Sequence, residues 1–199
     1  MLKYLTFLFA VACGACGPAE LETEDSSVVV EGVVEEVPVD PYPWAVWEEC
    51  GQLFDQNPCN FSFMDQHGEM SDLYQHYGKV IVVDFSTMWC GPCNSAAPYA
   101  ETFKQDYGED NFIWVTILVQ DSQGNDTDQA DLQAWASTHG LEDPILSATR
   151  DEVYDPDGIT GYPLGGWPTM VVIDREMILR YGIYGWSEQA MRTSIEGWL

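Results

Sequence analysis

The sequence predicts an α/β domain in which helices pack on a β-sheet. Four apolar runs predict strands, at residues 80–85, 112–119, 169–173 and 178–183. Helices are predicted between or after them, at residues 94–107, 128–139 and 187–199. Strands that alternate with helices in this way are typical of a layered α/β sheet.

A hairpin-like stretch precedes the first of these strands. Residues 61–63 alternate between apolar and polar side chains, and residues 65–68 carry a turn signal. Ser71 is expected to cap a short helical turn. Residues 61–78 therefore predict an extension on the N-terminal side of the sheet.

Proline, glycine and serine indicate where the helices bend, end and begin. Pro98 is expected to kink the helix after the first strand, because proline removes a backbone donor. Gly140 is expected to end the helix at residues 128–139, and Ser187 to cap the last helix. A short strand is predicted at residues 145–146.

Residues 1–16 predict an export signal. Lys3 precedes an apolar stretch at residues 5–12, which is too short to span a bilayer. A signal that ends on a cysteine resembles a bacterial lipoprotein signal, and Cys13 fits that pattern better than Cys16. An ordinary cleaved signal peptide is the alternative, and either form predicts an exported protein.

An acidic tether is predicted at residues 17–43, because this segment has many acidic residues and no Lys or Arg. The folded domain is then expected at residues 44–199. The whole chain has a net charge of −26, which argues against binding to nucleic acid. Contact with membrane is expected through the lipid anchor alone.

The pentapeptide Trp-Cys-Gly-Pro-Cys at residues 89–93 lies between a predicted strand and a predicted helix. Cys90, at the start of that helix, is exposed to the positive end of the helix dipole, which lowers a thiol pKa. We expect Cys90 to be the exposed nucleophile that attacks a disulfide. Cys93, one turn further and more buried, is expected to resolve the mixed disulfide.

With these residues, the chain resembles the thioredoxin superfamily, and most of all the exported, membrane-tethered thiol–disulfide oxidoreductases of bacteria (the TlpA/ResA-like group). The matching features are the pentapeptide, Asp84 six residues before Cys90, Pro98, and the Trp-Pro-Thr triplet at residues 167–169. The resemblance covers roughly residues 61–199. It implies a three-layer fold, with a central mixed sheet, helices on both faces, an N-terminal hairpin extension and a central helical insertion.

The resemblance also implies roles for residues around the thiols. Asp84, buried and with a raised pKa, would take a proton from Cys93. Pro168 is expected to be cis, so that the Trp167 backbone can pair with a strand of substrate. The expected contact surface for substrate is formed by Trp89, Gly91, Pro92, Trp167, Pro168 and Thr169.

Two departures from the family pattern affect the pKa values of the site. Asn94 stands where many thioredoxins carry Lys, and the strand at residues 114–119 has no Lys to pair with Asp84. The Gly-Pro pair between the cysteines resembles the reducing members, which favours a reductase.

Cys50 and Cys59 are the remaining cysteines of the domain, and a structural disulfide between them is expected in an oxidising compartment. A second redox pair is one alternative. A zinc site made with His67 and His76 is another, although its spacings are long and irregular.

The predicted function is thiol–disulfide exchange through Cys90 and Cys93, with no soluble cofactor and no metal. Expected partners are the disulfides or thiols of exported proteins, together with a membrane thiol donor, and the protein is expected to be a lipid-anchored, periplasmic monomer. One alternative is a peroxiredoxin-like thiol peroxidase, although the Pro of the Pro-x-x-x-Thr-x-x-Cys pattern is absent before Cys90. A non-catalytic binding module with a thioredoxin fold is the other.

Overall fold

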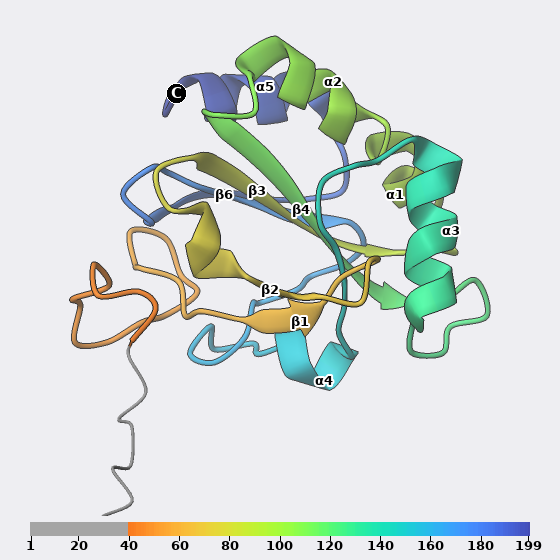
Figure 1. The fold of residues 1–199 in the computed structure, drawn as a ribbon, viewed down its shortest axis with the longest axis horizontal. Coiled ribbons are helices and arrows are strands. Elements are labelled where there is room, and N and C mark those ends of the chain that lie inside the picture. Colours follow the sequence, from red (N-terminus) through yellow and green to blue (C-terminus); the bar gives the residue numbers. More distant parts are fainter. Residues whose placement is uncertain (1–39) are drawn as a thin grey trace, which may run out of the picture. The chain divides into compact units, whose positions relative to one another are not determined.

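A mixed five-stranded sheet lies at the centre of the computed structural model, which describes residues 40–199 (Figure 1). Its strands follow the order β5 (Ile145–Ser147), β4 (Phe112–Gln120), β3 (Val80–Thr87), β6 (Thr169–Ile173) and β7 (Leu179–Tyr184). β3, β4 and β5 are parallel, whereas β6 is antiparallel to β3 and β7 is antiparallel to β6. The predicted α/β fold with a mixed central sheet is confirmed. The predicted signal, Cys13 and Cys16 lie outside the described residues, as does the tether up to residue 39.

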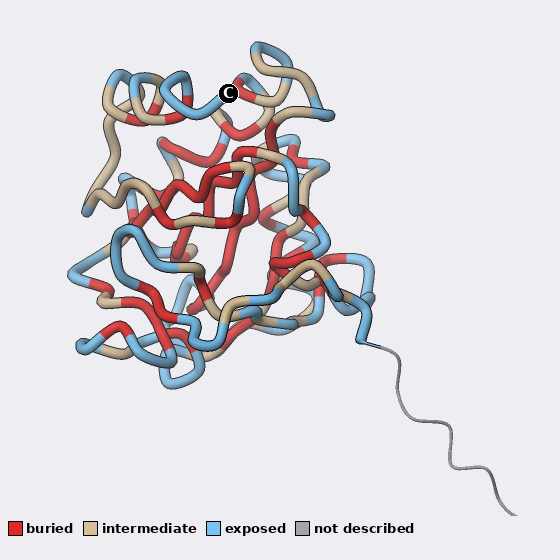
Figure 2. Tube along the Cα trace, turned by 90° about the vertical axis from the view of Figure 1, so that its left-hand side faces the viewer, coloured by how far each residue is buried: buried red, intermediate tan, exposed pale blue. Residues whose placement is uncertain are grey.

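Burial of β3 on both faces explains its continuous apolar sequence. All eight of its residues are buried, and side chains that alternate along it join two separate clusters. Val80 and Val82 belong to the first cluster, and Ile81, Val83 and Phe85 to the second. In Figure 2 the buried residues run along the strands at the centre of the domain.

The longer helices contribute side chains to the first cluster. They are α1 (Gly91–Ala96), α2 (Tyr99–Tyr107), α3 (Gln129–His139) and α5 (Glu188–Glu196). The second cluster is covered by shorter elements, which include the 3-10 helix η1 (Leu73–His76) and helix α4 (Arg150–Val153). The segment that contains α3, β5 and α4 lies between β4 and β6, at the position of the predicted helical insertion.

The helix after β3 begins earlier than residue 94 and is divided at Pro98. It begins at Gly91 because the Cys90 side chain accepts a hydrogen bond from the Cys93 amide, and because Pro92 favours a first helical turn. Pro98 then separates α1 from α2, a stronger effect than the predicted kink. Gly140 ends α3 with a positive φ of 71°, as glycine readily does.

The N-terminal hairpin pairs β1 (Ser62–Met64) with β2 (Met70–Asp72) in antiparallel fashion. Ser71 lies inside β2 and accepts a hydrogen bond from Gln75, so the expectation that Ser71 caps a helical turn is wrong. The residue before η1 is Asp72, and its side chain makes no capping bond.

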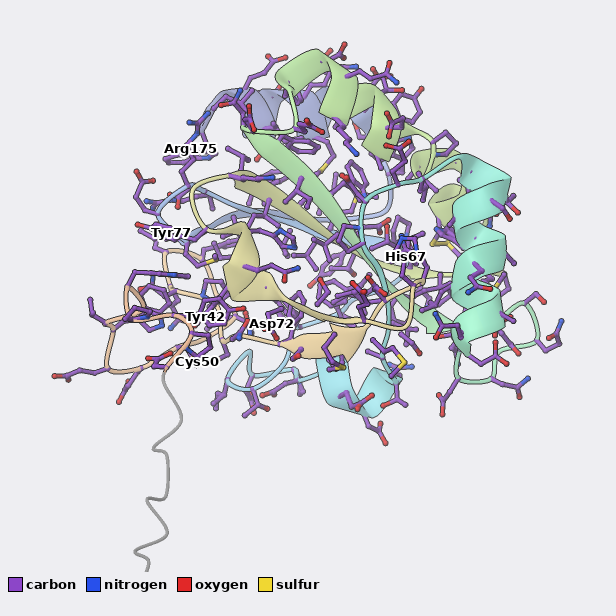
Figure 3. All side chains as sticks on the ribbon, in the orientation of Figure 1. Tyr42, Cys50, His67, Asp72, Tyr77 and Arg175 are labelled. Carbon is purple, nitrogen blue, oxygen red and sulfur yellow. A yellow bond between two sulfur atoms is a disulfide. The ribbon has the colours of Figure 1, made fainter. Side chains whose placement is uncertain are left out.

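Asp72 instead binds a residue from the start of the described chain. The Tyr42 hydroxyl donates to an Asp72 carboxylate oxygen at 2.7 Å, and the two residues lie close together in Figure 3. Burial and this bond raise the pKa of Tyr42 to about 12. Tyr42 also packs edge-on against Tyr74. The compact unit begins at Asp40, so residues 40–43, which the sequence analysis assigned to the tether, belong to the folded domain. Within residues 40–199, none of the helices is both long and apolar enough to cross a membrane.

Candidate active site

The pentapeptide lies where β3 leaves the sheet. The Met88 amide donates to the Gln120 carbonyl at 2.9 Å, and the Cys90 amide donates to the Thr87 carbonyl at 3.2 Å. These bonds hold the turn between β3 and α1 against the end of β4. Cys90 is thereby fixed at the N-terminal end of α1, where the sequence placed it.

The two sulfurs of the motif are joined in a disulfide, with the Cα atoms 5.2 Å apart. Cys93 is fully buried, whereas Cys90 is 4% exposed. Cys90 is therefore the more accessible of the two, but it is not the exposed side chain that the sequence suggested, because Met88 and Trp167 pack against the same cluster. The Cys93 amide donates to the Cys90 sulfur at 3.2 Å. In a reduced pair, such a donor favours the thiolate over the thiol.

Asp84 is completely buried in β3. Since side chains alternate along a strand, Asp84 lies on the same face as Val82, which is the face that packs against Cys93 and α1. Loss of hydration raises the pKa of Asp84 to about 7. A carboxyl group with that pKa can accept or release a proton near neutral pH.

The hydrogen bonding of the Asp84 carboxyl is incomplete. The Ser86 hydroxyl donates to one oxygen at 2.7 Å, whereas the other oxygen has no partner. Ser86, and to a lesser degree the nearby indole of Trp114, lower the pKa against the dominant effect of burial. Trp114 lies in β4, the strand that contains no Lys to pair with Asp84.

The Trp-Pro-Thr triplet lies at the same edge of the sheet as the cysteines. Thr169 begins β6 and pairs with Phe85 near the end of β3, which places Pro168 close to the point where the chain turns toward Cys90. The Trp167–Pro168 peptide bond is cis. Trp167 is half-buried and packs against both clusters, and the Thr169 hydroxyl donates to the Gly166 carbonyl at 2.7 Å.

Trp89, Gly91 and Pro92 form an exposed rim beside the disulfide. Trp89 is 51% exposed, and its indole N–H donates to the side chain of Gln120 at 3.1 Å. Gln120 in turn donates to the Gly124 carbonyl at 2.9 Å. Sequence reasoning missed Gln120, because nothing in a residue at the end of an apolar strand indicates that it binds the motif.

Asn94 is a second residue whose role was not visible in the sequence. Its side-chain amide donates to the carbonyl of Cys90 at 2.8 Å and to that of Met88 at 3.0 Å. The sequence indicated only that a positive charge is missing here. In the structure, Asn94 holds the backbone on either side of Trp89.

The Cys50–Cys59 disulfide lies away from this site, with Cα atoms 4.8 Å apart. The loop that it closes is hydrogen-bonded to β7, because the Asp55 amide donates to the Leu179 carbonyl at 2.9 Å and the Leu179 amide donates to the Gln56 carbonyl at 2.9 Å. Cys50 and His67 lie on opposite sides of Figure 3, so the structure does not assemble the zinc site considered above. Among residues 40–199, no three His, Cys, Asp or Glu side chains are grouped so as to hold a metal ion.

The sequence profile of the AhpC/TSA family matches residues 55–182. Thioredoxin-like protein YneN of Bacillus subtilis (strain 168) is 25% identical over 134 residues, which are 67% of this chain and 72% of that protein. Thiol-disulfide oxidoreductase ResA of Bacillus anthracis is 26% identical over 140 residues, 70% of this chain and 73% of that protein.

Among solved structures, a thiol:disulfide interchange protein of the thioredoxin family from Chlorobium tepidum TLS superposes with a TM-score of 0.56. It is 24% identical, and the superposition covers 70% of this chain and 92% of that one. This likeness supports the thioredoxin-like fold.

Proposed function

This chain belongs to the AhpC/TSA family and is a thiol–disulfide oxidoreductase, and we propose that Cys90 and Cys93 are its reactive dithiol. The observation that carries the proposal is the position of this pair, with one sulfur at the start of α1 within reach of a backbone donor and the other buried one turn further on. The Cys50–Cys59 pair has no comparable setting.

The first step is attack by the Cys90 thiolate on a substrate disulfide. A bond forms between Cys90 and one substrate sulfur, and the other substrate sulfur leaves as a thiolate. The Cys93 amide, which lies 3.2 Å from the Cys90 sulfur, lowers the thiol pKa and raises the fraction of Cys90 that can react.

In the second step, Cys93 attacks the Cys90 sulfur and the second substrate thiolate leaves. The enzyme is then oxidised at Cys90–Cys93, and the substrate has gained both electrons. Cys93 has to lose its proton before it attacks. Asp84 accepts that proton, directly or through water, because burial brings its pKa to about 7.

The proposed substrates are disulfides of exported proteins, and one example is apocytochrome c before haem attachment. The Gly-Pro pair between the cysteines favours the reducing direction, and a membrane thiol donor returns the dithiol to its reduced state. The proposed location is periplasmic, with Cys13 or Cys16 carrying a lipid and residues 17–39 acting as the tether. The chemistry needs no cofactor beyond the two sulfurs, and the proposed form is a monomer.

A trapping experiment tests the assignment of the pair. The Cys93→Ala variant is expected to stall with substrate covalently held on Cys90, and mass spectrometry identifies the adduct and the cysteine that holds it. The matched control adds Cys90→Ala and is expected to trap nothing. Equal trapping by that control would show that the wrong cysteines had been chosen.

Peroxide reduction is the competing activity to exclude in the same preparation. The expected result is catalytic reduction of insulin disulfides, with peroxide consumption no faster than that of a Cys90→Ser control. Rapid peroxide consumption that depends on Cys90, without insulin reduction, would favour the thiol peroxidase alternative.

A further inference from the structure

Trp89 is an exposed side chain that the fold holds in one position. Its indole N–H donates to Gln120 at 3.1 Å, and Gln120 is itself bonded to the backbone of the loop that follows β4. The Asn94 amide binds the carbonyls of Met88 and Cys90, on either side of Trp89, at 3.0 and 2.8 Å. Because the indole N–H is already bonded, Trp89 offers a partner the face of its ring, and covering that face costs little conformational freedom.

A second exposed tryptophan shows what this protein places on such a ring. Trp198 is 39% exposed, and the guanidinium carbon of Arg180 lies 4.6 Å from its ring centroid. Two further arginines lie over the rings of Tyr154 and Phe103. Trp89 is 51% exposed, yet no cation of the described domain lies over it. Of the aromatic side chains, tryptophan attracts a cationic group most strongly.

The surroundings of the disulfide carry acidic residues and no basic ones. Four segments meet at this end of the sheet, namely residues 86–95, 120–128, 165–169 and 184–188. They contain no Lys, Arg or His, and their charged residues are Asp121, Asp126, Asp128 and Glu188. Glu188 is paired with Arg192. The negative charge beside Trp89 therefore comes mainly from the loop after β4, in which Asp126 is exposed.

The basic residues of the described domain lie elsewhere. Lys79 directly precedes β3, and Arg175 donates to Asn111, which directly precedes β4, so both lie at the opposite end of these strands. The others have partners within the fold: Lys104, Arg180 and Arg192 pair with carboxylates, and Arg150 lies over a tyrosine ring. A cationic group beside Cys90 therefore has to come from another molecule. The net charge of −26 favours its approach.

We propose that the ring of Trp89 binds a cationic side chain of the substrate, best an arginine, one or two positions from the cysteine that Cys90 attacks. The inference rests on the proposed function and adds a substrate class to it, namely disulfides in basic segments. Trp89 directly precedes Cys90, so the two contact neighbouring residues of one substrate. The ring accommodates a planar guanidinium, and the acidic loop after β4 attracts its charge.

The test uses peptides of one sequence that contain one intramolecular disulfide, with an arginine placed in turn at each position beside a cysteine. Each arginine peptide has a matched citrulline version, which keeps the shape of the side chain without its charge, and a glutamate version. At one or two positions, arginine is expected to raise kcat/KM for reduction about twofold to fivefold over citrulline, the range of an exposed cation–π contact. Glutamate is expected to give the lowest kcat/KM.

Salt separates contact with the ring from attraction by the acidic loop. At about 0.5 M salt the attraction between exposed charges is largely screened, so the part of the arginine-to-citrulline ratio that remains measures the contact with Trp89. Asp126→Asn is expected to lower the ratio at low salt alone. Asp110→Asn is the matched control, because it makes the same change in charge before the start of β4, and it should keep the ratio of the native protein.

A variant of Trp89 locates the contact. Trp89→Leu is expected to bring the arginine-to-citrulline ratio close to one at about 0.5 M salt. Because the ratio is taken within one enzyme, a general loss of activity does not disturb it. Phe54→Leu, which removes a 60% exposed ring from the loop closed by the Cys50–Cys59 disulfide, is the control and should keep the ratio.

Equal kcat/KM for arginine and citrulline peptides at every position and at both salt concentrations overturns the proposal. A ratio that Trp89→Leu leaves unchanged overturns it as well, because the cation is then recognised elsewhere. Both results leave the proposed function intact. Failure to reduce any peptide would instead overturn the proposed function, and the substrate inference with it.

Discussion

The two disulfides of the described domain differ in their surroundings more than in their geometry. Cys90 and Cys93 lie three positions apart at the start of a helix, both are buried, and a backbone amide donates to one sulfur. Cys50 and Cys59 lie nine positions apart in a loop, with Cys50 exposed. Exposure alone would select Cys50 and Cys59 rather than the pair that we propose. Reactivity depends instead on the groups that stabilise a thiolate and on a proton acceptor nearby.

The largest expected effect is the difference in activity between a variant that lacks Cys90 and a variant that lacks the Cys50–Cys59 disulfide. Cys90→Ser is expected to lower insulin reduction by roughly a thousandfold or more, because the attacking thiolate is gone. The double variant Cys50→Ala with Cys59→Ala should keep most of the activity. An activity loss in the double variant as large as that in Cys90→Ser would mean that both pairs take part in the reaction.

Asp84 sharpens the comparison, because this fully buried acid lies on the face of β3 that packs against the cluster containing Cys90 and Cys93. Folding raises the pKa of Asp84 from 3.8 to about 7. At pH values between these two, Asp84 keeps its proton in the folded protein and has lost it in the unfolded chain. The free energy of unfolding of the oxidised protein should therefore fall by roughly 4 kcal/mol as pH rises from 4 to above 7.

Denaturant titrations across this pH range measure that loss, and Asp84→Asn is the matched control that should remove it. The same substitution should slow the resolving step, seen as accumulation of the mixed disulfide. A pH dependence of stability identical in Asp84→Asn and the native protein would argue against a neutral buried carboxyl.

Loss of the Cys50–Cys59 bond should affect stability rather than turnover. Closing a loop of this length restricts the unfolded chain, and its removal is expected to cost about 2.5 kcal/mol. Urea unfolding of the Cys50→Ala, Cys59→Ala protein measures this cost. No change in stability, together with a change in turnover, would indicate a relay of electrons through this pair.

Gln120→Ala should have the smallest effect. It frees the Trp89 indole and leaves both sulfurs in place, so kcat/KM for a protein substrate should fall about threefold through KM, while the reaction with a small disulfide stays unchanged. Measuring KM and kcat separately checks this. A fall in kcat with small disulfides would show that Gln120 acts on the thiols themselves.

Local signals in the sequence were enough to predict the sheet and the position of the motif. The β3 strand could be recognised from its apolar run, which follows from burial of both its faces, and the C-terminal end of α3 could be recognised because Gly140 is a strong local signal. The family pattern predicted the cis bond before Pro168, which the structure contains. Ser71 was misassigned because a serine followed by an aspartate can either end a short strand or cap a helical turn, and the sequence around Ser71 fits both.

Contacts between distant segments could not be predicted in the same way. Trp89 meets Gln120 across 31 positions, and Tyr42 meets Asp72 across 30. A cavity beside β7 combines Gln52 with Tyr162 and Tyr184, which share no motif. Such contacts depend on how loops pack, and no periodic pattern in the sequence encodes that packing.

The most direct measurement is the rate at which iodoacetamide labels each cysteine of the fully reduced protein as pH is varied. Cys90 is predicted to react first, with a midpoint below about 7.5. Cys93, Cys50 and Cys59 should react more slowly at neutral pH. A midpoint for Cys90 near the ordinary value of about 8.5, with labelling no faster than that of Cys50, would contradict the account.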